Sequence, residues 1–164
     1  MGEDRPHSQI ELRRFEKQQR SPEFRVWLDR EADDLAQLVT LAPGLANLDD
    51  PWTAPGLAAI EAAALARFPD PGETGTDDEL AYLALCARGI GHTYLRALGA
   101  GKWVWIQILQ GNPIGAALEI PGVGVYIDPE EHVRRVIFDR EPDTLTRMLD
   151  TLRTLRTWDE PAYQ

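Results

Sequence analysis

The sequence predicts an α+β fold, in which N-terminal helices pack on an antiparallel meander of three or four strands and a C-terminal helix closes the domain. Three observations lead to this prediction. Apolar residues recur at helical spacing in the first half of the chain, short β-forming runs separated by turn residues follow, and a further helical pattern comes last. Because helices and strands occupy separate parts of the chain, α+β is the natural class.

The chain of 164 residues has the size of one domain with a hydrophobic core. Residues 1–20 are polar, and we interpret them as an N-terminal arm that is loose or forms a marginal helix. Residues 21–158 are expected to form a single α+β domain, and residues 159–164 a polar C-terminal tail.

Two helices are expected after the arm. The motif S-P-E at residues 21–23 combines a capping serine with proline at the first helical position, and the helix that it begins is expected to end at Pro43. Residues 44–53 then read as a loop. Thr53 is expected to cap a second helix over residues 54–68.

An acidic linker at residues 69–75 leads to the third helix, which has the clearest local signals. Thr76 and Glu79 have the spacing of a capping box, in which each side chain accepts a hydrogen bond from the other residue's backbone N–H. Apolar residues recur at helical spacing up to Leu98, and Gly99 can adopt the positive φ that ends many helices.

Residues inside this third helix lead to two further expectations. His92 shares one face with Arg88 and Arg96, which predicts a cationic strip that faces solvent or a partner. Gly89 and Gly91 are poor helix formers, and we expect them to let another backbone approach closely.

The strands of the predicted meander follow the third helix. They are expected over residues 103–108, 116–120 and 123–127, joined by turns with the motifs G-N-P and P-G, with a fourth over residues 133–138. The motif E-P-D at residues 141–143 then begins the closing helix.

The first strand is apolar on both faces. Trp103 and Trp105 project from one face, while Val104, Ile106 and Ile108 project from the other. Two interpretations remain open. Either both faces are buried within the chain, or one face or its rim binds a partner protein, because aromatic residues are enriched at interface hot spots.

The segment after the third strand is acidic. Asp128, Glu130 and His132 alternate, so an extended backbone would place three possible metal ligands on one side. Pro129 interrupts that pattern and Glu131 competes with it, which favours an acidic loop between strands over a metal site. No metal, no cofactor and no catalytic residues are expected, since the sequence shows no phosphate loop and no nucleophile elbow.

The charge balance indicates which partners are suitable. The chain has 17 basic and 27 acidic residues, a net charge of −10. Nucleic acid and anionic membrane are disfavoured as partners, because binding them requires cations that neutralise phosphates, and a protein with a basic surface is favoured. The single cysteine, Cys86, excludes an intrachain disulfide, and the N-terminus lacks a secretory segment, so a cytoplasmic location is expected.

Several short motifs carry a resemblance to a known kind of protein. The L-G-A-G-K-W motif at residues 98–103, G-N-P at 111–113 and Y-I-D-P at 126–129 resemble a pattern of small acidic bacterial proteins, from which Ala100 departs by separating the two glycines. The motifs F-R-V-W-L at 24–28 and L-A-A-I-E at 57–61 resemble its actinobacterial members. The resemblance implies a shared fold, and some proteins of this build are similar to immunity proteins of bacterial toxin systems.

These observations lead to the hypothesis of a non-enzymatic protein-binding module, in the form of an immunity-like or antitoxin-like inhibitor of a basic toxin. The predicted partner-binding residues are Trp103, Trp105, Asp128, Glu130 and Glu131. One alternative is a small-molecule-binding protein or minor enzyme with a pocket between sheet and helices. Another is a structural subunit that buries its aromatic face in a homodimer.

Overall fold

The computed structural model describes residues 8–72, 75–107, 111 and 113–158. Within these residues the chain forms eight helices and one antiparallel pair of strands, so the predicted α+β meander of three or four strands is wrong and the fold is mainly helical. In chain order the elements are α1 (Gln9–Gln19), α2 (Pro22–Asp29), α3 (Glu31–Leu41), α4 (Pro43–Ala46), α5 (Ala54–Arg67), α6 (Asp77–Leu98), β1 (Lys102–Ile106), β2 (Gly115–Glu119), α7 (Pro129–Asp139) and α8 (Thr144–Trp158).

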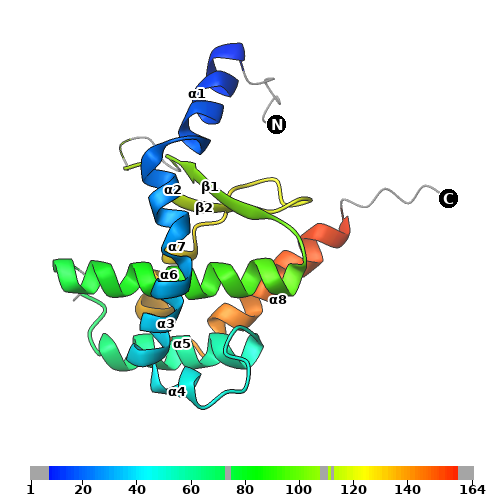
Figure 1. The fold of residues 1–164 in the computed structure, drawn as a ribbon. Helices are drawn as coiled ribbons and strands as arrows, with labels where there is room; N and C mark the ends of the chain where they lie inside the picture. The colour runs from blue at the N-terminus through cyan, green and yellow to red at the C-terminus, as the bar shows by residue number, and fades with distance from the viewer. Residues whose placement is uncertain (1–7, 73–74, 108–110, 112, 159–164) are drawn as a thin grey trace.

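Helix α6 runs through the middle of the molecule, and Figure 1 shows α5 on one side of it and the sheet on the other. Its ends confirm the sequence prediction. The side chains of Thr76 and Glu79 form the reciprocal capping box, and Gly99 ends the helix with a φ of +63°. Because α6 packs against α3, α5, α7 and α8, most of the core is built around it.

The glycines inside α6 make room for side chains of other elements. A Cβ atom on Gly91 would lie 2.1 Å from Cη2 of Trp103, and one on Gly89 would lie 2.5 Å from Cδ2 of Leu38. The sequence suggested that another backbone approaches here. Side chains from β1 and α3 fill the space instead.

The sheet is smaller than predicted. The first two predicted strands correspond to β1 and β2, although β1 ends at Ile106 and residue 108 lies outside the described residues. The third predicted strand, residues 123–127, is wrong except for one isolated bridge, in which Leu118 and Ile127 exchange two backbone hydrogen bonds.

The fourth predicted strand, residues 133–138, is wrong because it lies within helix α7. Asp128 caps this helix by accepting a hydrogen bond from the backbone N–H of Glu130, and Pro129 occupies the first helical turn. The expected acidic loop is therefore a helix start. Side chains that a strand would place on opposite faces lie on one buried face of the helix, namely Val133, Val136 and Ile137.

The N-terminal part of the chain is more helical than the sequence suggested. The segment interpreted as an arm forms α1 within its described residues, with Ser8 and Glu11 in a second capping box. Ser21 caps α2 as predicted, but the long helix expected after it is interrupted at Arg30, where α2 ends and α3 begins.

Both faces of the sheet are covered by helices of the same chain. On one face, the rings of Trp103 and Trp27 are 4.8 Å apart and those of Trp105 and Phe24 are 5.4 Å apart, measured between centroids. On the other face, Phe15 of α1 packs against a small apolar cluster formed by Val104, Ile106 and Ala117. Both apolar faces of the first strand are therefore buried within the chain.

A buried ion pair joins α6 to α2 and α3. The Arg88 residue is only 1% exposed, and its Nε and Nη2 donate hydrogen bonds of 3.2 and 3.0 Å to Oδ2 of Asp34. The guanidinium carbon lies 3.3 Å from the ring centroid of Trp27, and Nη2 also donates to the Trp27 carbonyl. Burial lowers the pKa of Arg88, and the hydrogen bonds to Asp34 oppose that shift.

The cationic strip predicted on α6 is paired within the chain. Besides Arg88, His92 Nδ1 lies 2.9 Å from a carboxylate oxygen of Glu31, and Arg96 forms an exposed ion pair of 2.6 Å with Asp50. Acidic residues of α3 and of the loop between α4 and α5 therefore pair with this face of α6.

We predict that Gly91→Ala lowers the free energy of unfolding by about 1–3 kcal/mol, because the added methyl group overlaps the Trp103 ring. The loss is expected despite the higher helix propensity of alanine. Urea unfolding measures it, with Gly115→Ala as control, since no atom lies within 4 Å of a Cβ at that position. A Gly91→Ala variant as stable as the wild type would contradict the close packing described here.

We also predict that Arg88→Met destabilises the fold by about 3–5 kcal/mol, because the Asp34 carboxylate loses its buried cation and keeps only the exposed Arg30 as an ionic partner. The double variant Arg88→Met/Asp34→Leu should recover most of that loss. Thermal and urea unfolding compare both with Arg96→Met, which removes an exposed ion pair and should have a much smaller effect. Equal losses for Arg88→Met and Arg96→Met would refute the structural role of the buried pair.

Candidate functional site

A groove of about 460 Å³ lies between the first turn of α7 and the β1–β2 hairpin. Part of its lining is apolar and accessible, since Leu80 is 41% exposed and Ile114 is 45% exposed. The charged residues of its lining are three carboxylates and one cation, namely Asp128, Glu130, Glu131 and Arg134.

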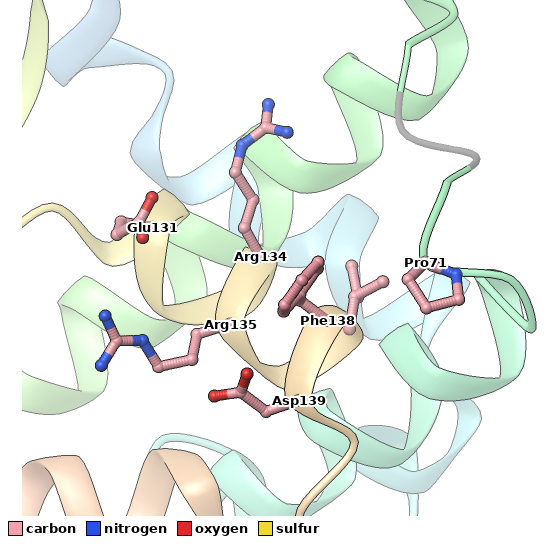
Figure 2. A pocket seen from close by; sticks show the side chains of 7 residues that line it. Pro71, Glu131, Arg134, Arg135, Phe138 and Asp139 are labelled. Atoms are coloured by element: carbon pink, nitrogen blue, oxygen red, sulfur yellow. The ribbon is translucent and has the colours of Figure 1, made fainter.

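A second hollow, of about 410 Å³, lies further along α7. Its most accessible apolar side chain is Phe138, which is 75% exposed. Figure 2 shows Phe138 on the side of α7 that faces Pro71, while Arg135 points away from Pro71. Asp139 completes the charged residues at this end of the helix.

The groove and the hollow share Glu131 and Arg134, so they form one continuous region that we call the α7 surface. Apolar side chains lie at its two ends, with Leu80 and Ile114 at one and Phe138 at the other. Charged groups lie between them. Accessible apolar side chains beside charged groups are features of surfaces that bind proteins.

The groove end of the α7 surface carries net negative charge. Glu130 is neutralised by Arg134, whose Nη2 lies 2.8 Å from Oε1 of Glu130. Glu131 is exposed and Asp128 is partly buried. Burial raises the pKa of Asp128, and the hydrogen bond from the Glu130 backbone N–H opposes the shift. Asp128 thus serves both as the cap of α7 and as an acidic group at the groove.

The structure brings together three of the five predicted partner-binding residues and separates the other two from them. Asp128, Glu130 and Glu131 all line the groove. Trp103 is 9% exposed and packs on Gly91, and Trp105 is half-buried against α2, so neither lines the groove or the hollow.

His132 lies behind the α7 surface and does not line it. Its Nδ1 shares a hydrogen bond of 2.9 Å with the hydroxyl of Tyr94 on α6. Burial, assisted by the nearby Arg135, lowers the pKa of His132 to about 4, and burial raises the pKa of Tyr94. Both groups are therefore neutral at pH 7, and the pair joins α6 to α7.

Sequence reasoning missed the apolar positions of the α7 surface. Phe138 lies in the segment predicted as the fourth strand. Leu80 has the spacing of the apolar residues of the third helix, which predicts burial, but it is 41% exposed. A signal for the true arrangement was present in residues 128–131, D-P-E-E, which is a capping aspartate followed by proline and an acidic first turn. If this motif begins a helix, helical spacing places Phe138 on the face opposite Val133.

Possible metal ligands and the thiol are the remaining reactive groups among the described residues. Among them, no group of three His, Cys, Asp or Glu side chains is arranged to hold a metal ion. Cys86 is fully buried, and burial raises the pKa of its thiol to about 12, so the thiolate that would react is scarce at pH 7. In the same described part of the chain, every helix is too short or too polar to cross a membrane.

Comparison of the chain with protein-family models, curated proteins and solved structures finds no match. The resemblance to small acidic bacterial proteins therefore stays a prediction, and the α7 surface is interpreted from its own geometry.

We predict that His132 makes the fold less stable in acid. Its pKa is about 4 in the folded state against 6.5 for a free side chain, so the unfolded chain binds more protons between these values. Stability is retained above about pH 6.5 and is lost progressively as the pH falls towards 4, by roughly 3 kcal/mol in total.

Urea unfolding of wild type and His132→Gln between pH 7 and pH 4 tests this prediction, because titrating groups far from His132 cancel in the difference. The advantage of the wild type should shrink as the pH falls. Tyr94→Phe keeps the imidazole and should keep the wild-type pH dependence. A difference between wild type and His132→Gln that is constant with pH would rule out the assignment.

Proposed function

We propose that this protein is a non-enzymatic protein-binding module that uses its α7 surface to bind a basic segment of a partner protein. The observation that carries the proposal is the combination of carboxylates that line the groove with the accessible side chains of Leu80, Ile114 and Phe138. The acidic groups would attract and orient the segment, and the apolar ends would supply most of the affinity.

The charge of the whole protein supports a basic partner. Its net charge of −10 gives long-range attraction to a cationic protein and repulsion from nucleic acid. Electrostatic attraction of this kind mainly raises the association rate. The uncompensated carboxylates at the groove, Asp128 and Glu131, would then pair with Lys or Arg side chains of the segment.

The apolar ends of the surface support binding of a segment over binding of a single ion. Phe138 is the most exposed aromatic residue among those described, and it lies beside a hollow large enough for a side chain of the partner. Exposed aromatic rings that become covered are frequent hot spots of protein interfaces.

The more specific form of the proposal is an inhibitor that covers the cationic site of a basic toxin in the cytoplasm, as immunity proteins and antitoxins do. What supports this form is the acidic groove, the net charge and the single buried cysteine, which fits a reducing compartment.

The alternatives raised by the sequence have less support. A small-molecule-binding pocket between sheet and helices would be favoured by a cleft lined with Asp128, Tyr126 or His132. Of these three residues, only Asp128 lines the groove. The aromatic face that a homodimer was expected to bury is already covered by α2.

A labelled peptide of alternating Lys and Leu residues tests the proposal by fluorescence anisotropy, with a Glu/Leu peptide as the negative probe. We expect the cationic peptide to bind. Glu130→Gln/Glu131→Gln should weaken binding about 3- to 30-fold, because it removes two negative charges from the groove and leaves the positive charge of Arg134 unpaired, and should reduce its salt dependence. Phe138→Ala should weaken binding about tenfold through loss of the aromatic contact.

The matched control is Asp29→Asn/Asp33→Asn, which removes the same charge from exposed residues of α2 and α3. It should bind the peptide nearly as well as the wild type. If the control loses as much affinity as Glu130→Gln/Glu131→Gln, the attraction is a property of the net charge and the α7 surface is not the site.

A further inference from the structure

The outer edge of β1 is satisfied by a side chain instead of by another strand. The backbone N–H of Trp105 donates to Oε1 of Gln19, and Nε2 of Gln19 donates to the Trp105 carbonyl, both at 2.9 Å. In an antiparallel sheet, the N–H and C=O of one residue form this pair of bonds with the residue opposite. The amide of Gln19 thus occupies the place of a neighbouring strand.

The two edges of the small sheet are protected in different ways. On the β2 side, the backbone of Ile127 exchanges two hydrogen bonds with Leu118, so the chain itself covers that edge. On the β1 side, the cover is the elbow between α1 and α2, and Gln19 is the last residue of α1. An uncovered edge is a template on which a further strand can pair.

The element that carries Gln19 is held to the domain by few contacts. Within its described range, α1 contains no fully buried residue. Its main apolar anchor is Phe15, which is half-buried on the outer face of the sheet and lies 6.4 Å from the ring of Tyr126. In Figure 1, α1 extends beyond the sheet, away from the other helices. Displacing α1 therefore costs less than displacing any helix of the core.

We infer that the outer edge of β1 is a self-association surface that Gln19 and Phe15 keep closed. Its occupant after release of α1 is β1 of a second copy, paired antiparallel about a two-fold axis at Trp105. The backbone groups of the two Trp105 residues would then replace the bonds to Gln19.

The register of such a pairing favours the second copy as occupant. Antiparallel pairing centred on Trp105 places Val104 of one copy opposite Ile106 of the other, on the face that Phe15 covers in the monomer. Release of α1 exposes these apolar side chains, and pairing with the second copy brings them into contact across the two strands. The charged residue Lys102 lies at the end of the paired region, so like charges are not placed opposite each other beside the axis.

Two further features keep the surface closed in the wild type. Pro22 follows the elbow, and proline inside a helix would remove a hydrogen bond, so α1 and α2 are prevented from fusing into one straight helix that would withdraw Gln19. The net charge of −10 on each copy also opposes association. Self-association should therefore require loss of the Gln19 contacts and be favoured by salt.

Sedimentation velocity over a hundredfold range of protein concentration tests the inference, at about 0.15 M salt, where charges beyond about 8 Å are screened. We expect the wild type to stay monomeric and Phe15→Ala/Gln19→Ala to form a dimer at the higher concentrations. Gln18→Ala is the matched control, because it removes the adjacent glutamine of the same helix and should leave the protein monomeric. If the double variant does not fold, Gln19→Ala alone is tested for dimer formation in the same way.

Amide hydrogen exchange at Trp105 provides the second readout. In dilute, monomeric Gln19→Ala, loss of the bond to Gln19 should make this amide exchange about tenfold faster than in the wild type. Protection should return as the variant dimerises. The inference is overturned if the folded variants remain monomeric at all concentrations, if the dimer leaves the Trp105 amide unprotected, or if the wild type dimerises equally well.

Discussion

The buried charge of Arg88 is the constraint on which the arrangement of the other elements depends. Removing a guanidinium from water costs several kcal/mol unless a carboxylate and further contacts replace its hydration. Helix α3 supplies the carboxylate of Asp34, and α2 supplies the ring of Trp27 on which Arg88 stacks. The same Trp27 ring packs against Trp103, whose indole fits on Gly91 one turn further along α6. One cation therefore fixes α2 and α3 on α6, and through α2 it fixes the inner face of the sheet.

The position of the α7 surface is set by packing on another side of the same central helix. Helix α7 packs on α6 through its buried apolar side chains and through the hydrogen bond between Tyr94 and His132, which burial keeps neutral. With that face committed to the core, Glu131 and Phe138 are left pointing outward. The groove exists because the β1–β2 hairpin, which is held by Trp103, ends close to the start of α7. The packing contacts that hold α7 and the hairpin on α6 thus also shape the proposed binding surface.

The correct sequence predictions rest on interactions between residues that are close in sequence. The capping box of Thr76 and Glu79 and the glycine after α6 act within one helical turn, and both were confirmed. Residues 133–138 were assigned to a strand because valine, isoleucine and phenylalanine favour strands, but the apolar spacing and the preceding cap allowed a helix that packing on α6 selects. The contact of Gln19 with Trp105 spans 86 residues and leaves no local pattern. The acidic residues of the α7 surface could be identified from composition, whereas their apolar neighbours could not, because exposure is decided by which helices pack together.

The most direct test of the account is to map where a basic ligand contacts the protein. Backbone amide chemical shifts recorded during titration with the alternating Lys/Leu peptide report each residue separately. The account predicts that the largest changes cluster at Leu80, Ile114, Glu131 and Phe138, with small changes at α1, α2 and α3. Changes that are spread evenly over all acidic surfaces, or centred on α3, would contradict the assignment of the α7 surface as the binding site.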